Sequence, residues 1–168
     1  MPKKVVFIIG HTGAGKSLLA IELGKYYDCP ILSYSNLGRI QGVEDSEEIV
    51  QQNESLFIQE LKQTIAKTDM LLAEGVSSPR IVETIRGYGV EALAISLNVP
   101  YHIRIQRIMQ REKCSEEQAI SIEGIKERAK NKVGLSDVLE FCHEDLDGTL
   151  PPKEVLNKAI KLIEGRNR

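Results

Sequence analysis

The sequence predicts an α/β protein in which a parallel sheet of about five strands lies between layers of helices. Two observations lead to this fold class. Residues 5–9 form a continuous run of β-branched and aromatic residues, which lacks the alternation of a half-exposed strand and is typical of a strand covered on both faces. Further short, mainly apolar runs follow, such as residues 70–73 and 92–97. Segments with apolar residues at helical spacing separate these runs, and such an alternation indicates parallel strands joined by helical crossovers.

The individual elements follow from the same patterns in chain order. Strands are expected at residues 5–9, 31–33, 70–73, 92–97 and, as a fifth, 138–142, where a helical turn fits nearly as well. Helices are expected at residues 16–27, 44–67, 78 onward, 100 onward, 115 onward and 151–164. Pro79 stands at a first helical position, and Ser115 with Gln118 forms a capping box, so both positions mark helix starts.

Length and composition indicate one globular domain over residues 1–168. Hydrophobic residues make up 42% of the chain and charged residues 27%, which is ordinary for a soluble protein. The formal net charge is -2, so we do not expect a protein that binds nucleic acid through general positive charge. The three cysteines form no C-x-x-C pair, which argues against a disulfide framework or a zinc ribbon. No apolar run approaches a membrane span, and we expect a cytoplasmic location.

The strongest motif lies directly after the first strand. Residues 10–17 read Gly-His-Thr-Gly-Ala-Gly-Lys-Ser and match the phosphate-loop pattern G-x-x-x-x-G-K-[ST] at every fixed position. Glycines let the backbone turn its N–H groups toward phosphate oxygens, and the following helix directs its positive end at the same anion. The expected nucleotide-binding residues are Gly10, His11, Thr12, Gly13, Ala14, Gly15, Lys16, Ser17 and Leu18. ATP and Mg²⁺ are therefore the expected cofactors, with Ser17 as a metal ligand.

A second acidic position supports this interpretation. Glu74 ends the apolar run at residues 70–73 and is followed by Gly75. A carboxylate at the end of a strand beside the phosphate loop can hold Mg²⁺ directly or through water, and it can also act as a general base. The sequence leaves both roles open for Glu74, and a solvated glutamate at a strand end is the simpler alternative.

Arginines occur in two places where they could contact anions. Arg39 follows the second expected strand and could hold an anionic group of an acceptor. Arg104, Arg107 and Arg111 share one helix face, where they could neutralise charge on a transferring phosphoryl group. A solvent-exposed face paired with neighbouring glutamates is the alternative, because charge runs on helices are usually exposed.

Taken together, these features resemble the nucleoside and nucleotide kinase branch of the phosphate-loop (P-loop) proteins. The resemblance implies a three-layer P-loop NTPase fold with a small helical lid at about residues 104–118. In adenylate-kinase-like enzymes an arginine at the place of Arg39 binds the acceptor phosphate, and lid arginines correspond to Arg107 and Arg111. Residues 127–129 and 147–150 are more similar to dephospho-CoA kinases, in which the loop corresponding to residues 143–148 borders the adenine.

The residues after the second strand favour a phosphate acceptor over a hydroxyl acceptor. Dephospho-CoA kinases usually carry an aspartate there, whereas this chain has Ser33, Ser35 and Asn36. A hydroxyl acceptor benefits from a general base, while a phosphate acceptor is already anionic and chiefly needs cationic positioning. The sequence therefore favours a monomeric or homodimeric kinase that transfers the γ-phosphoryl group of MgATP to a nucleotide-like acceptor, such as a (deoxy)nucleoside monophosphate. Lys16, Glu74, Arg39, Arg107 and Arg111 are its expected catalytic residues.

Several alternatives stay open at this point. One is a dephospho-CoA-kinase-like transfer to a sugar hydroxyl, and another is a nucleotide-binding switch that acts on a protein or RNA partner. The first forty residues also resemble tRNA dimethylallyltransferases, although those chains are much longer. Shikimate kinases have a similar length, but their aspartate pair after the second strand and glycine pair after the third are absent here.

Overall fold

The computed structural model describes residues 3–34, 47–140 and 142–165, and in this part of the chain it shows a five-stranded parallel sheet. The order across the sheet is β2-β3-β1-β4-β5, and every paired ladder is parallel. The strands are β1 (Lys4–Gly10), β2 (Ile31–Ser33), β3 (Met70–Glu74), β4 (Glu91–Asn98) and β5 (Glu144–Asp147). This arrangement confirms the predicted fold class.

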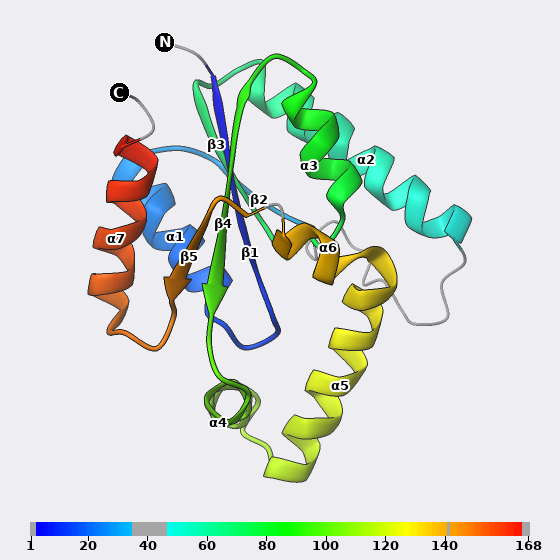
Figure 1. The fold of residues 1–168 in the computed structure, drawn as a ribbon, viewed down its shortest axis with the longest axis vertical. Coiled ribbons are helices and arrows are strands. Elements are labelled where there is room, and N and C mark those ends of the chain that lie inside the picture. Colours follow the sequence, from blue (N-terminus) through cyan, green and yellow to red (C-terminus); the bar gives the residue numbers. More distant parts are fainter. Residues whose placement is uncertain (1–2, 35–46, 141, 166–168) are drawn as a thin grey trace.

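Helices cover both faces of the sheet and extend beyond its carboxyl edge (Figure 1). The helices are α1 (Lys16–Tyr27), α2 (Glu47–Ile65), α3 (Pro79–Arg86), α4 (Tyr101–Glu112), α5 (Glu116–Val133), α6 (Leu135–Glu140) and α7 (Pro152–Gly165). Helices α1 and α7 lie on one face, and α2, α3 and α6 lie on the other. Helices α4 and α5 lie below the ends of the strands, on the side where the phosphate loop leaves β1.

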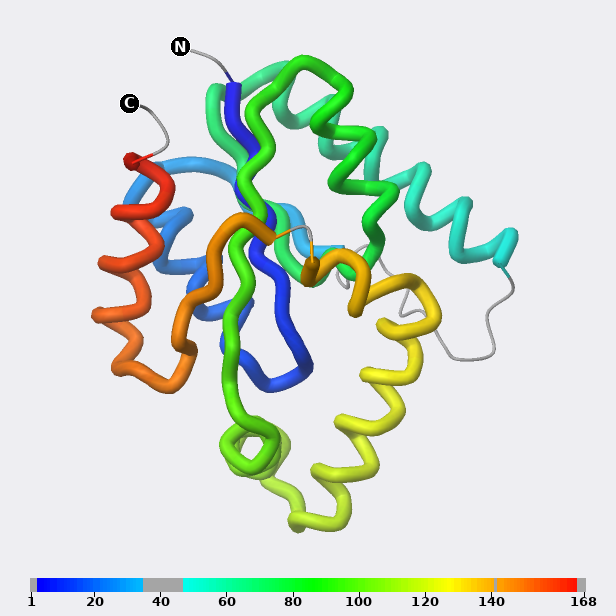
Figure 2. The backbone as a smooth tube through the Cα atoms, in the orientation of Figure 1, coloured from blue at the N-terminus to red at the C-terminus, as the bar shows by residue number. Residues whose placement is uncertain are grey.

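Strand β1 supplies the centre of the core because its side chains serve both faces. Val5, Phe7 and Ile9 belong to the cluster under α2, α3 and α6, whereas Val6 and Ile8 belong to the cluster under α1 and α7. All five side chains are completely buried. The tube in Figure 2 shows the same strand in the middle of the molecule. A strand covered on both faces needs no polar alternation, which is why the continuous apolar run predicted it correctly.

The region expected to hold the fifth strand is different. Residues 135–140 form α6, and Val138 packs into the core beneath it, so the helical alternative at this position is confirmed and the strand is wrong. Strand β5 begins later, at Glu144, and only Leu146 of its four residues is buried. An edge strand pairs on one side only, so it needs little apolar sequence and leaves a weak pattern.

Helices α4 and α5 form a separate hairpin with its own small apolar cluster. Ile105 and Ile108 of α4 pack against Ala119 of α5. The capping box predicted at Ser115 is present, since the Ser115 Oγ accepts from the Gln118 backbone N–H and the Gln118 side chain accepts from the Ser115 N–H. This hairpin contains the segment predicted as a lid. Within the described residues, no helix is both long and apolar enough to cross a membrane.

Candidate active site

The phosphate loop occupies the corner between β1 and α1 and depends on two glycines in left-handed conformation. Gly13 has a φ of 85° and Gly15 a φ of 95°. A Cβ atom on Gly13 would also lie 2.9 Å from the Arg104 carbonyl oxygen, so a larger residue has neither the backbone freedom nor the space. The N–H groups of Lys16 and Ser17 belong to the first helical turn and have no preceding helical carbonyl partner. The corner therefore offers N–H donors and a positive helix end to an anion.

Lys16 lies against the loop that precedes it. Its Nζ donates to the His11 carbonyl oxygen at 3.0 Å. Burial, together with the nearby Lys130 ammonium, lowers the pKa of Lys16 from 10.5 to about 7. Part of the Lys16 population is thus neutral near neutral pH, and a bound anion would stabilise the charged form.

Glu74 stands at the end of β3, next to the loop, because β3 pairs directly with β1. Its Oε1 accepts hydrogen bonds from the Ser17 Oγ at 3.3 Å and from the Ser33 Oγ at 2.6 Å. The structure thus brings together Ser17 and Glu74, which the sequence predicted as metal ligands. Their hydroxyl and carboxylate oxygens are ligands that suit Mg²⁺.

These two residues alone do not make a complete metal cage. No group of three or more His, Cys, Asp or Glu side chains in the described residues could hold a metal ion. Mg²⁺ commonly takes one or two protein oxygens and fills its other positions with water and substrate phosphates. The donor set of Ser17 and Glu74 therefore fits a magnesium ion that arrives with a nucleotide.

The three arginines of α4 do not form one shared surface, because each side chain has different contacts. Arg104 is buried, donates to the carbonyl oxygens of Val99 and Thr12 at 3.2 Å each, and pairs with Glu123 at 3.4 Å. It therefore fastens α4 to the loop and to α5. Arg111 is exposed and pairs with the adjacent Glu112 at 3.1 Å. This contact does not test its predicted catalytic role, which stays a prediction.

Arg107 lies at the loop itself. Its two terminal nitrogens donate to the Ala14 carbonyl oxygen at 3.2 Å and to the Gly148 carbonyl oxygen at 2.6 Å. The guanidinium thus bridges the phosphate loop and the loop that follows β5. Arg39, the predicted acceptor ligand, lies outside the described residues, and its role stays a prediction.

A cavity of about 210 Å³ opens beside the phosphate loop. Its lining comes from the loop, α1, β4, α4, the segment after β5 and α7: Ala14, Gly15, Leu18, Leu19, Glu22, Leu97, Arg107, Gly148, Leu150, Pro152 and Val155. Gly148 has to be small here, because a Cβ atom would lie 2.5 Å from Val99 Cγ2 and 3.3 Å from the Ala14 carbonyl oxygen. The cavity is mainly apolar and reaches the phosphate loop at one end, with the Arg107 guanidinium on its wall.

Sequence reasoning missed a polar cluster that α5 brings to the loop. Glu127 Oε1 accepts from the Thr12 backbone N–H at 2.6 Å, and its Oε2 lies 2.8 Å from His11 Nδ1. Lys130 Nζ donates to Thr12 Oγ1 at 2.9 Å and pairs with Glu127 at 3.6 Å. Burial would raise the pKa of Glu127, but the hydrogen bonds from His11 and Thr12 and the charge of Lys130 outweigh it and hold that pKa well below its usual range.

A sequence signal for this cluster exists. Glu123, Glu127 and Lys130 recur at helical spacing, so they lie on one face of α5. That face also carries Ala119, and it is buried against α4 and the loop. Charged residues that share a face with a packing alanine are a signal of a buried polar contact.

Comparison with known proteins identifies the fold of this chain but not its activity. No protein-family model matches the sequence, and no curated protein matches it. An uncharacterized protein from Eubacterium ventriosum ATCC 27560 superposes with a TM-score of 0.72 at 16% identity, over 96% of this chain and 99% of that one. A shikimate kinase from Acinetobacter baumannii in complex with shikimate gives 0.65 at 17%, over 99% and 94%.

A third solved structure, a sugar kinase from Janibacter sp. HTCC2649, gives a TM-score of 0.70 at 12% identity, over 97% of this chain and 95% of that one. The chain therefore has the α/β P-loop fold that these kinases share. Shikimate kinases are among the structures with this fold, although their expected motifs after the second and third strands are absent from this sequence. A specific likeness to adenylate or dephospho-CoA kinases stays a prediction.

Proposed function

We propose that this protein is an ATP-dependent phosphotransferase that acts on a small molecule. The observation that carries the proposal is the complete phosphate-loop motif folded at a strand–helix corner, with Lys16, Ser17 and Glu74 around it. The names of the structural neighbours, shikimate kinase and sugar kinase, support the same class of reaction.

The donor phosphates would lie along the phosphate loop. The N–H groups at the start of α1 would bind phosphate oxygens, and the Lys16 ammonium would contact the β and γ phosphates. Ser17 would hold Mg²⁺, and Glu74 would hold it directly or through water. When bound, the ion would neutralise charge on the β and γ phosphates.

The nucleoside of the donor would occupy the cavity beside the loop. Its volume of about 210 Å³ is small, and its apolar walls come from Leu18, Leu19 and Leu150. The planar guanidinium of Arg107 is held by two backbone carbonyls, so it is positioned to stack on an aromatic ring rather than to move freely. These features suit a purine or pyrimidine base next to a phosphate-binding corner.

We further propose a nucleotide-like acceptor, with a (deoxy)nucleoside monophosphate as the first candidate. The lack of an aspartate after β2 supports an acceptor that needs no general base. Arg39 would then bind the acceptor phosphate. Catalysis would come from alignment of the acceptor oxygen with the γ-phosphorus and from charge neutralisation, with no covalent enzyme intermediate.

One observation favours a hydroxyl acceptor as the second candidate. Glu74 is a buried carboxylate within 2.6 Å of the Ser33 hydroxyl, at the end of β2. A carboxylate at that place could take the proton of an acceptor hydroxyl as its oxygen attacks the γ-phosphorus and the bond to the departing ADP breaks. The two neighbours named as shikimate and sugar kinases support this candidate.

Release of ADP from MgATP tests the proposal directly. We would measure it with nucleoside monophosphates, dephospho-CoA, shikimate, simple sugars and simple alcohols as acceptors, and with Lys16→Ala as the control. Acceptor-stimulated ADP release that disappears in Lys16→Ala is the expected result, because that variant loses the phosphate-binding ammonium. Binding of ATP without any acceptor-stimulated release would instead favour a nucleotide-dependent switch.

A further inference from the structure

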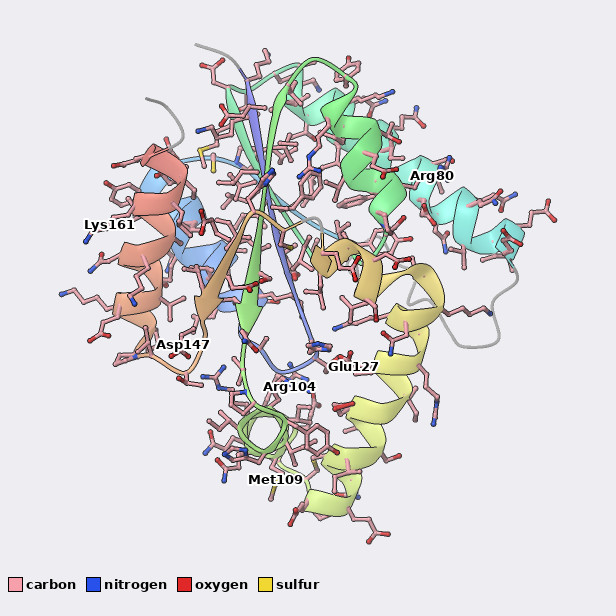
Figure 3. The ribbon with its side chains drawn as sticks, viewed as in Figure 1. Arg80, Arg104, Met109, Glu127, Asp147 and Lys161 are labelled. Carbon is pink, nitrogen blue, oxygen red and sulfur yellow. The ribbon has the colours of Figure 1, made fainter. Side chains whose placement is uncertain are left out.

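Two lysine side chains from different helices meet at the phosphate loop. Lys16 Nζ donates to the His11 carbonyl oxygen, and Lys130 Nζ donates to the Thr12 hydroxyl one residue further along. The Lys130 side chain is only 19% exposed. Figure 3 shows Glu127, one turn before Lys130 on α5, in the space between that helix and the end of β1. Ammonium groups from two helices, α1 and α5, therefore lie close together at the loop.

Two adjacent, buried ammonium groups raise the free energy of the folded protein when no anion is bound. Two neighbouring ammonium groups repel each other, and burial removes the water that would solvate them. Burial lowers the pKa of Lys130, and the Glu127 carboxylate offsets only part of that shift. The adjacent carboxylate of Glu127 is shared among three partners: the Thr12 N–H, His11 and Lys130. An anion at the loop would offset the repulsion that the protein leaves only partly compensated.

We propose that Lys130 is a second phosphate-binding residue, which contacts the terminal phosphate of the donor together with Lys16, and that Glu127 is the residue that positions it. The inference rests on the proposed function for the identity of the donor. It extends that function by naming a cation from α5, the helix in which the predicted lid segment ends, as part of the phosphate site.

The role of Glu127 follows from its hydrogen bonds. One carboxylate oxygen is fixed by the Thr12 backbone N–H at 2.6 Å, and the other lies against His11 at 2.8 Å. Both partners belong to the loop, so Glu127 ties α5 to the phosphate site. Lys130 stands three residues later on the same helix face, and its ammonium is thereby placed at the Thr12 hydroxyl.

The first test compares ligands that differ only in phosphate number. Affinities of AMP, ADP, ATP and inorganic tripolyphosphate are measured by calorimetry for the wild type, Lys130→Ala, Lys130→Arg and the control Arg128→Ala, which removes an exposed cation of the same helix. Lys130→Ala should weaken ATP and tripolyphosphate by about 10- to 100-fold, the range for one charged hydrogen bond, and leave AMP unchanged. Lys130→Arg should recover part of the loss, and Arg128→Ala should lose little.

The outcomes separate this inference from the proposed function. Equal loss for all ligands, or no loss for ATP and tripolyphosphate, overturns the role of Lys130. If the wild type binds tripolyphosphate but not ATP, the nucleotide donor is wrong, and the tripolyphosphate series still decides the role of Lys130. If the wild type binds neither, the phosphate site itself is wrong and both proposals fall.

The second test separates positioning by Glu127 from a merely structural role. The amide of Glu127→Gln can still accept from the Thr12 N–H, but it carries no charge to stabilise the Lys130 ammonium. The charged or titratable groups around the two lysines are Glu127, Lys126, His11 and Glu74. Tripolyphosphate affinity should therefore fall more steeply as the pH rises from neutral to alkaline in Glu127→Gln than in the wild type. An equal loss at neutral and at alkaline pH, with unchanged steepness, overturns the positioning role.

Discussion

Ser33 and Glu74 lie 41 residues apart in the chain, yet the Ser33 Oγ donates to the Glu74 Oε1 at 2.6 Å. The two residues are direct partners in the parallel pairing of β2 with β3, so the sheet register itself fixes the contact. The same carboxylate oxygen accepts from Ser17 at the start of α1. Glu74 thus joins the predicted metal side of the site to the end of β2, where the acceptor is expected.

Glu74→Gln should separate the two roles that remain open for this residue. The amide oxygen can still accept from Ser17 and Ser33, so the fold should be retained. If Glu74 holds Mg²⁺, the variant should need more Mg²⁺ for half-maximal activity. If Glu74 is the base for a hydroxyl acceptor, kcat should fall by about 10²- to 10⁴-fold at saturating Mg²⁺. Steady-state rates across a magnesium titration decide between them, and an unchanged titration with unchanged kcat would exclude both roles.

The buried Lys16 should make stability rise with pH. Burial and the Lys130 ammonium lower the pKa of Lys16 in the folded protein to about 7, whereas its ordinary value is 10.5. Between these two values the unfolded chain holds a proton that the folded chain has released, so the free energy of unfolding increases with pH in this window. Below it both states are charged, and the cost of the buried ammonium is present in full.

Urea denaturation of the wild type and of Lys16→Met at about pH 7 and about pH 9 checks this dependence. The wild type should gain more stability than Lys16→Met over that interval, because the variant has no proton to release at this position. Parallel curves for the two proteins would show that the pKa of Lys16 is not lowered.

Arg107→Ala should impair recognition of the nucleoside more than recognition of the phosphates. The guanidinium lies on the wall of the cavity and donates to the Ala14 carbonyl oxygen of the loop. Loss of stacking and of this wall should weaken ATP by about tenfold, while tripolyphosphate should bind nearly as before. Competition binding with both ligands provides the measurement. Lys130→Ala should instead weaken ATP and tripolyphosphate alike, so the two variants serve as controls for each other.

Gly148→Ala should destabilise the fold by about 1 to 3 kcal/mol, the usual cost of forcing a methyl group into a packed site. The added Cβ would lie 2.5 Å from Val99 Cγ2. The double variant with Val99→Ala should recover part of this loss relative to Val99→Ala alone, since the second change removes the clashing methyl group. Chemical denaturation of the wild type, the two single variants and the double variant gives the coupling free energy between positions 148 and 99. Strictly additive effects would contradict the short distance between the added Cβ and Val99.

The sequence predicted the phosphate loop and the central strands because their signals are local. Gly13 and Gly15 are required by the backbone of the turn itself, and β1 is apolar because it is covered on both faces. The edge strand β5 was placed too early, since an edge strand with one buried residue leaves almost no pattern. Its place depends on the tertiary pairing with β4.

The polar contacts of the site were harder to predict for a related reason. Arg107 and Arg111 are one helical turn apart and look equivalent in sequence, yet only Arg107 reaches the loop, because Arg111 lies farther along α4. Glu127 and Lys130 belong to α5, which is far from the loop in the sequence and contacts it only in the folded protein. Helical spacing identifies which face they share, but it cannot say what that face contacts.

The contacts of Arg104 have a mechanical consequence. This side chain donates a hydrogen bond to the Thr12 carbonyl oxygen of the loop and also pairs with Glu123 on α5. Movement of the α4–α5 hairpin away from the sheet would therefore either break these bonds or displace the phosphate loop. A ligand bound at the phosphate loop should therefore also slow the exchange of backbone amide hydrogens in the α4–α5 hairpin.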